Sequence, residues 1–218
     1  VDLFKNRKLQ LAFTTKNEFL VLDRNGNIVD QFHKKFSKSN LLPLSVFDYD
    51  NNRNYRFAIS HGNEVALYDN SFKRLKGFKF NKTESAILSS PQHILIGTKD
   101  YIAIPEVNGK LHLVDRQGNS RTDIKKTFDF DKSEFSNHKN NIVFKDANNI
   151  VYSVNISSGK VSKTDILQGD NTNSVYHTNE LKVKLEDHIL TINDKTIELE
   201  YGNYNTPKIF KFNNITSN

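Results

Sequence analysis

LQLAFTTKNEFLVLDRNGN, residues 9–27, is the stretch that decides the fold, because its pattern occurs five times along the chain. Each copy has an apolar run, a short turn, a second apolar run and a turn led by Asp or Asn. This order is typical of antiparallel strands joined by tight turns. The other copies are FAISHGNEVALYDNSFK from Phe57, IAIPEVNGKLHLVDRQGN from Ile102, NIVFKDANNIVYSVNISSGK from Asn141 and LKVKLEDHILTINDKT from Leu181.

The spacing of the copies indicates the architecture. The residue that opens the second turn is Asp23, Asp69, Asp115, Asn155 or Asn193, so the steps are 46, 46, 40 and 38 residues. A repeat of about 40–50 residues with several strands is typical of a β-propeller blade. We therefore predict an all-β propeller of about five four-stranded blades, or a five-blade arc of a larger propeller.

The repeat divides residues 1–218 into five predicted units of one β-propeller domain or segment. Their approximate bounds are 1–36, 44–80, 91–128, 133–167 and 174–212. An inner strand should precede each hairpin, and the candidates are Leu3–Lys5, Leu44–Asp48, His93–Gly97, the weaker Ser133–His138, and Ser174–Thr178. A more polar outer strand should follow each hairpin, and the candidates are Ile28–Phe32, Arg74–Phe80, Arg121–Phe128, Lys160–Leu167 and Thr196–Tyr201.

Composition excludes some classes of protein. The chain is polar, with 36% hydrophobic and 26% charged residues, but 16 Phe and 8 Tyr supply bulky apolar volume in a periodic pattern. That pattern argues against intrinsic disorder. The absence of cysteine excludes disulfides, thiolate metal sites and a cysteine nucleophile.

Nothing in the sequence assigns a compartment. No apolar run is long enough to span a membrane as a helix, and no signal peptide is present. We therefore expect a soluble protein, in the cytoplasm or in the cell envelope or periplasm. Because the chain starts at Val1 and contains no methionine, we interpret it as a processed or excised segment.

The net charge is +6 and comes mostly from lysine. The segments that connect one predicted repeat to the next should emerge on one face of a propeller, and they are basic on balance. A basic face would attract an acidic partner or a polyanion, although scattered surface lysine also serves to prevent edge-to-edge aggregation of strands. The candidate binding residues are His33, Lys34, Lys35, Lys38, Lys82, Lys132, His138 and Lys139.

One segment has the alternating oxygen ligands of a calcium loop. Asp48, Asp50 and Asn52 stand at every second position, which is the spacing that calcium loops use. The sixth position is Arg53 where glycine is usual, and the twelfth is Ile59 where an acidic residue is usual. We expect no cofactor, with calcium at these three residues as the alternative.

Signatures of catalysis are absent. The seven histidines do not show the spacing of a zinc protease, and no nucleophile elbow, phosphate loop or dinucleotide fingerprint occurs. An enzymatic propeller would gather acidic and aromatic side chains in its channel. Asp48, Tyr49, Asp100 and Tyr101 are the cluster to inspect for that alternative.

The turn Ser157-Ser158-Gly159-Lys160 after the run Val151–Val154 resembles the blade repeat of quinoprotein-like propellers, and similar short motifs occur in WD40-like propellers. Looser versions follow Asp23 and Asp115. Quinoprotein dehydrogenases hold their cofactor with tryptophan and often a vicinal disulfide, whereas this chain has neither Trp nor Cys. The resemblance therefore implies a non-enzymatic relative, such as the outer-membrane assembly propellers that bind proteins. The segment Phe47–Ile59 also looks like the integrin-type propeller, but its calcium ligands are incomplete.

These observations predict a non-catalytic binding scaffold that mediates protein–protein interaction. Two alternatives stay open: a carbohydrate-active or lyase-type propeller enzyme, and a polyanion-binding module with a basic loop face. A protein partner is the main expectation, because loops on a rigid scaffold are the usual place for recognition.

Overall fold

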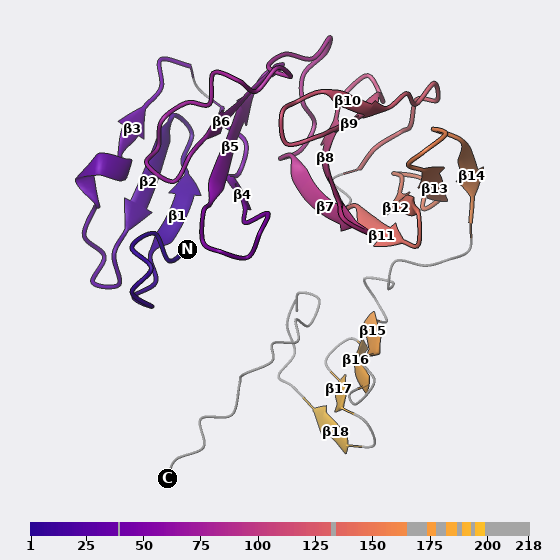
Figure 1. Ribbon diagram of the computed structural model, residues 1–218. Helices are drawn as coiled ribbons and strands as arrows, with labels where there is room; N and C mark the ends of the chain where they lie inside the picture. Colours follow the sequence, from indigo (N-terminus) through magenta and orange to yellow (C-terminus); the bar gives the residue numbers. More distant parts are fainter. Residues whose placement is uncertain are drawn as a thin grey trace. The chain divides into compact units, whose positions relative to one another are not determined.

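The computed structural model describes residues 1–38, 40–131 and 134–164, and the strand residues 174–177, 182–186, 189–192 and 195–198 (Figure 1). The chain forms two compact units, Val1–Asp165 and Ile166–Asn218. Among the described residues, no helix has the length and apolar character needed to cross a membrane.

The described strands form five antiparallel sheets, and within each sheet the strands follow chain order. Four sheets belong to the first unit and the fifth to the second unit. The first two consist of β1 (Leu11–Thr14), β2 (Glu18–Leu22) and β3 (Lys34–Lys35), and of β4 (Ser45–Phe47), β5 (Arg56–His61) and β6 (Glu64–Tyr68). The third consists of β7 (Gln92–Ile96), β8 (Lys99–Pro105), β9 (Leu111–Val114) and β10 (Ser120–Thr122). The fourth consists of β11 (Ser136–His138), β12 (Asn141–Lys145), β13 (Val151–Asn155) and β14 (Val161–Lys163), and the fifth of β15 (Ser174–His177), β16 (Lys182–Glu186), β17 (Ile189–Ile192) and β18 (Lys195–Glu198).

Three apolar cores join consecutive sheets of the first unit. The first core contains Phe19 of β2 together with Phe57 and Ile59 of β5. The second joins the second and third sheets, and the third joins the third and fourth. Side chains on β5 are buried on both faces because alternate residues point into two different cores. Sheets that follow one another and pack face to face form a β-propeller, as the repeat predicts.

Within the first unit, the segments that connect consecutive sheets lie at the same edge as the turns that follow β1, β5, β8 and β12. Each of the three connectors in the first unit forms backbone hydrogen bonds with the hairpin of its own sheet and with the next sheet. This confirms that connectors and middle turns share one face. The bonds run from Phe36 N to Asn17 O, Leu42 N to Ser60 O, Thr83 N to Asn63 O, Leu88 N to Pro105 O, Phe128 N to Gly109 O and Ala147 N to Asp129 O.

In each of the first four sheets, the Asp or Asn side chain that leads the turn accepts two backbone N–H groups, two and four residues ahead in the first three sheets and two and three residues ahead in the fourth. The side-chain oxygen of Asp69 accepts the backbone N–H groups of Ser71 and Lys73 at 2.8 and 2.9 Å. Asp23, Asp115 and Asn155 each likewise accept two backbone N–H groups. The fifth copy, Asn193, lies outside the described residues.

Several strand predictions for the first two sheets are wrong. Residues Leu3–Lys5 form a turn and not an inner strand, because the Asp2 carboxylate accepts the N–H groups of Asn6 and Arg7. Ile28 forms only an isolated bridge with Leu22 and is followed by a 3-10 helix, η1 (Asp30–Phe32), so β3 is the outer strand. Arg74 likewise forms only an isolated bridge, with Tyr68. The predicted inner strands at His93–Gly97 and Ser174–Thr178 are confirmed within one residue at either end by β7 and β15.

Candidate functional site

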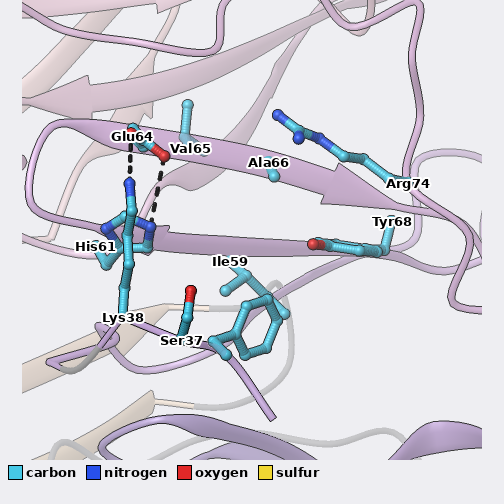
Figure 2. A pocket seen from close by; sticks show the side chains of 10 residues that line it. Ser37, Lys38, Ile59, His61, Glu64, Val65, Ala66, Tyr68 and Arg74 are labelled. Atoms are coloured by element: carbon cyan, nitrogen blue, oxygen red, sulfur yellow. Dashed lines mark hydrogen bonds and ion pairs between the residues drawn. The ribbon is translucent and has the colours of Figure 1, made fainter. Parts of the chain in front are cut away.

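A pocket of about 180 Å³ lies on the face of the second sheet that packs toward the first sheet. Figure 2 shows side chains of β5 and β6 along one side of it and residues of the connector after β3 along the other. It lies at the edge where connectors and middle turns meet. The lining residues are Phe36, Ser37, Lys38, Ile59, His61, Glu64, Val65, Ala66, Tyr68 and Arg74.

The pocket is open because one residue of its apolar floor, Ala66, has a small side chain. Ile59 and Ala66 are cross-strand partners in the β5–β6 hairpin, so their side chains share a face. Ala66 ends at Cβ, and the space beside the larger Ile59 and Tyr68 side chains stays open (Figure 2). Tyr68 is held in place by Phe72, whose ring stacks on it at 4.5 Å between centroids.

One end of the pocket is close to neutral in charge. The Glu64 carboxylate binds the Lys38 ammonium at 2.7 Å and lies 3.6 Å from His61 Nε2 (Figure 2). The hydrogen bond from Lys38 lowers the pKa of Glu64, and this effect outweighs the opposing effect of burial. Glu64 therefore stays ionised at neutral pH and offsets the charge of Lys38.

The other end is cationic. The Lys34 ammonium lies 5.2 Å from the centroid of the Tyr68 ring and 5.6 Å from that of Phe36, within cation–π range. Arg74 is exposed and forms an isolated backbone bridge with Tyr68. Within the described ranges, neither Lys34 nor Arg74 forms an ion pair with a carboxylate. Burial raises the pKa of Tyr68, so its hydroxyl remains a donor at neutral pH.

The basic residues predicted as a binding face are divided among several places. Lys38 lines the pocket, Lys34 lies over the ring of the lining residue Tyr68, and Lys82 bridges to Glu64 through the backbone. His33 and Lys35 both bind the Glu18 carboxylate, at 3.2 Å each. Lys34 and Lys35 lie in β3, not in a connector. His138 also lies in a strand, β11, beside the turn residue Lys139 in the fourth sheet, and Lys132 lies outside the described residues.

Sequence reasoning missed the aromatic and apolar part of the pocket. The alternation Glu64, Ala66, Tyr68 places these three side chains on one face of β6. A small residue in the middle of such a series is the signal that could have indicated a gap. Arg74 and Phe36 gave no signal of this kind, because they come from segments outside the hairpin.

The proposed calcium loop uses its oxygens for other contacts. The Asp48 carboxylate accepts the backbone N–H groups of Asn52 and Arg53, and Asn52 Oδ1 accepts the N–H of Asn54. Asp50 pairs with Arg116 at 2.8 Å. Calcium at this loop stays a prediction. In the part of the chain that the structure describes, no three His, Asp or Glu side chains gather as a metal site.

Two members of the cluster inspected for enzymatic activity do come together. The buried Asp100 carboxylate binds His93 Nε2 at 2.6 Å and Arg116 Nε at 2.5 Å. The Arg116 guanidinium also lies 4.6 Å from the centroid of the Tyr49 ring. This network, which we call the Asp100 network, joins the loop after β4 to the third sheet. Tyr101 instead belongs to the core between the third and fourth sheets, and Asp48 stays in its own turn.

Comparisons with known proteins support the fold. No protein-family model matches the chain, and no curated protein matches it. Among solved structures, the chain is similar to BBS1N in a complex with ARL6DN soaked with lead, with a TM-score of 0.59 and 8% identity over 92% of this chain. A second crystal of that complex, soaked with mercury, gives a TM-score of 0.54.

The chain spans 65% and 64% of the BBS1N chain in these two structures, which is just under two thirds. BamB from Moraxella catarrhalis also matches, at a TM-score of 0.49 and 12% identity over 92% of this chain and 64% of that chain. At 8% identity, the similarity to BBS1N supports the β-propeller fold.

Proposed function

We propose that this β-propeller is a non-catalytic scaffold that binds a protein partner through the pocket between its first two sheets. The pocket itself carries the proposal. An apolar floor of the size of one side chain, surrounded by charged groups, is the usual form of an anchor site in a protein interface. BBS1N, whose fold is similar, was crystallised in a complex with ARL6DN, which gives a precedent for this use of the fold.

The carboxylates Glu18 and Glu64 favour this function over polyanion binding. They bind His33, Lys35 and Lys38 within the molecule. A polyanion-binding face needs a continuous cationic surface, whereas these pairs interrupt the predicted one. Arg116 and His93 are likewise committed to Asp100, so the Asp100 network supports a structural role better than a catalytic one.

Selection of peptides from a random display library tests the proposal. The bait is the purified protein, and the decisive variant is Ala66→Leu, which fills the pocket. Ala147→Leu is the matched control, because Ala147 is exposed in the β12–β13 turn. We expect peptides selected on the wild type to bind A147L equally and to lose about tenfold or more in affinity for A66L. Peptides that bind A66L as tightly as the wild type, or no enrichment on the wild type, would overturn the proposal.

A further inference from the structure

We infer that the segment bound in this pocket is acidic: a peptide with an apolar side chain in the pocket and a neighbouring carboxylate on Arg74. The inference rests on the proposed function and names the chemistry of its partner. The inference depends on the difference in charge between the two ends of the pocket.

The cations at the Tyr68 end are available to a ligand, unlike the other basic residues near the pocket. Lys38, Lys35 and His33 each lie within ion-pair distance of a carboxylate. For Lys34 and Arg74, no carboxylate lies within ion-pair distance among the described residues, and the Lys34 ammonium lies over the rings of Phe36 and Tyr68. Cations that lie near the pocket without an anionic partner attract a negative group from outside.

The donors at this end suit a carboxylate. An arginine guanidinium presents a planar fork of N–H groups that matches the two carboxylate oxygens. Arg74 bridges to Tyr68 through the backbone, so its side chain starts beside the phenol ring. Figure 2 shows the Arg74 side chain beginning near Tyr68 and extending along β6 toward Ala66, with Lys38, His61 and Glu64 at the opposite end of the pocket. A carboxylate at the Arg74 guanidinium would therefore receive hydrogen bonds as well as charge.

Glu64 fixes the direction of the ligand. A carboxylate placed at the opposite end would meet the ionised Glu64 and be repelled by it, and Lys38 is already bound to that group. The pocket volume of about 180 Å³ has room for a single side chain on the floor made by Ile59 and Ala66. An apolar residue flanked by acidic residues satisfies both requirements.

Synthetic peptides with a fluorescent label test the inference by anisotropy. The set is GEELEEG and GEEFEEG, the neutral versions GQQLQQG and GQQFQQG, the basic versions GKKLKKG and GKKFKKG, and GEEGEEG, which lacks the apolar anchor. The variants are Arg74→Gln and Lys34→Gln, with Lys76→Gln as the control that removes an exposed charge outside the pocket. Thermal unfolding of each variant checks that it stays folded.

We expect the acidic anchored peptides to bind about tenfold more tightly than the neutral ones. R74Q and K34Q should each remove most of that difference, whereas K76Q should change it less than about twofold. Equal binding of acidic and neutral peptides would overturn the acidic ligand and leave the proposed function intact. Equal binding of GEEGEEG and GEELEEG, unchanged by A66L, would show charge attraction without the pocket and would contradict both. If none of the peptides binds, the acidic ligand is rejected, and the display selection alone decides the function.

Discussion

At the scale of single residues, glycines in the repeated turn show how consecutive sheets fit together. Gly118 and Gly159 both have positive φ, and each lies against the tail of the preceding sheet. A Cβ on Gly118 would lie 2.5 Å from the backbone nitrogen of Phe80, and one on Gly159 would overlap the carbonyl of Asp123. The corresponding Gly26 of the first sheet also has positive φ, but a Cβ there meets nothing within 4 Å.

These three glycines allow the cost of positive φ to be separated from the cost of close packing. Gly26→Ala should lower the free energy of unfolding by about 1 kcal/mol, because alanine is strained at positive φ. Gly118→Ala and Gly159→Ala should each cost about 1–3 kcal/mol more, because backbone must also move. Urea unfolding of the three variants checks this. Equal losses in the free energy of unfolding would mean that the backbone of the preceding sheet can move away from the added Cβ at no cost in stability.

The residue that leads the turn should tolerate an amide but not an alanine. Asp69→Ala removes the acceptor of two backbone N–H groups, and we expect a loss of about 1 kcal/mol in the free energy of unfolding. Asp69→Asn keeps that acceptor, as Asn155 does naturally in the fourth sheet, and should change stability by less than about 0.5 kcal/mol. A large loss in D69N would show that charge, and not hydrogen bonding, matters at this turn.

At the scale of secondary-structure elements, the Asp100 network fixes the loop after β4 to the third sheet. Arg116→Ala would leave the buried Asp100 carboxylate with His93 as its remaining ionic partner, so we expect a loss of about 3 kcal/mol. Asp50→Asn is the control, because the Asp50 side chain is 55% exposed and its pair with Arg116 should contribute less than about 1 kcal/mol. Chemical denaturation of both variants measures these effects. Similar small losses would show that the loop is held by packing alone.

A second link between elements predicts how stability depends on pH. Glu106 of the segment after β8 is fully buried, and its carboxylate binds His112 of β9 and the backbone N–H of Ser85. Burial raises the pKa of Glu106, but the hydrogen bonds from His112 and Ser85 together lower it by more than burial raises it. The pKa of Glu106 is therefore lowered from 4.5. Its contribution to stability is therefore present above about pH 4.5 and lost as the pH falls through the folded-state pKa.

Glu106→Gln tests this link. The variant should be less stable than the wild type at pH 7, and its stability should fall less steeply below about pH 4.5. Glu18 and Glu64, whose pKa values are also lowered, leave some of the acid sensitivity in place. The urea midpoints of the variant and of the wild type, measured at pH 7 and below about pH 4.5, provide the measurement. A pH dependence identical to that of the wild type would contradict an ionised Glu106.

At the scale of the whole first unit, Val1–Asp165, the three cores share sheets, so stability should be shared as well. Phe19→Leu affects the first core and Phe144→Leu the third, and each should lower the free energy of unfolding by about 1 kcal/mol. Both should speed hydrogen exchange in β5 and β6, which lie between them. Leu9→Ala, at a residue that is 66% exposed, is the control. Faster exchange confined to the altered sheet would show that the sheets unfold separately.

The sequence by itself determined the strands and turns that depend on local pattern. Alternation, continuous apolar runs and the Asp- or Asn-led turn require only neighbours in the chain, so the hairpins around Asp23, Asp69, Asp115 and Asn155 could be predicted. The strand β3, which pairs by only two residues, could not, because so short a segment has no period of its own.

Only the tertiary structure decided which charges are paired and where a pocket remains. Glu18 and Glu64 neutralise residues that the sequence grouped as a basic face, and their partners lie up to 26 residues away in the chain. Arg116 reaches Tyr49 across 67 residues, and Lys34 reaches Tyr68 from another sheet. Such contacts depend on how consecutive sheets pack, and a local sequence pattern does not show which distant residues this packing brings together. The sequence therefore specifies the propeller, and the packing of its sheets creates the candidate binding pocket.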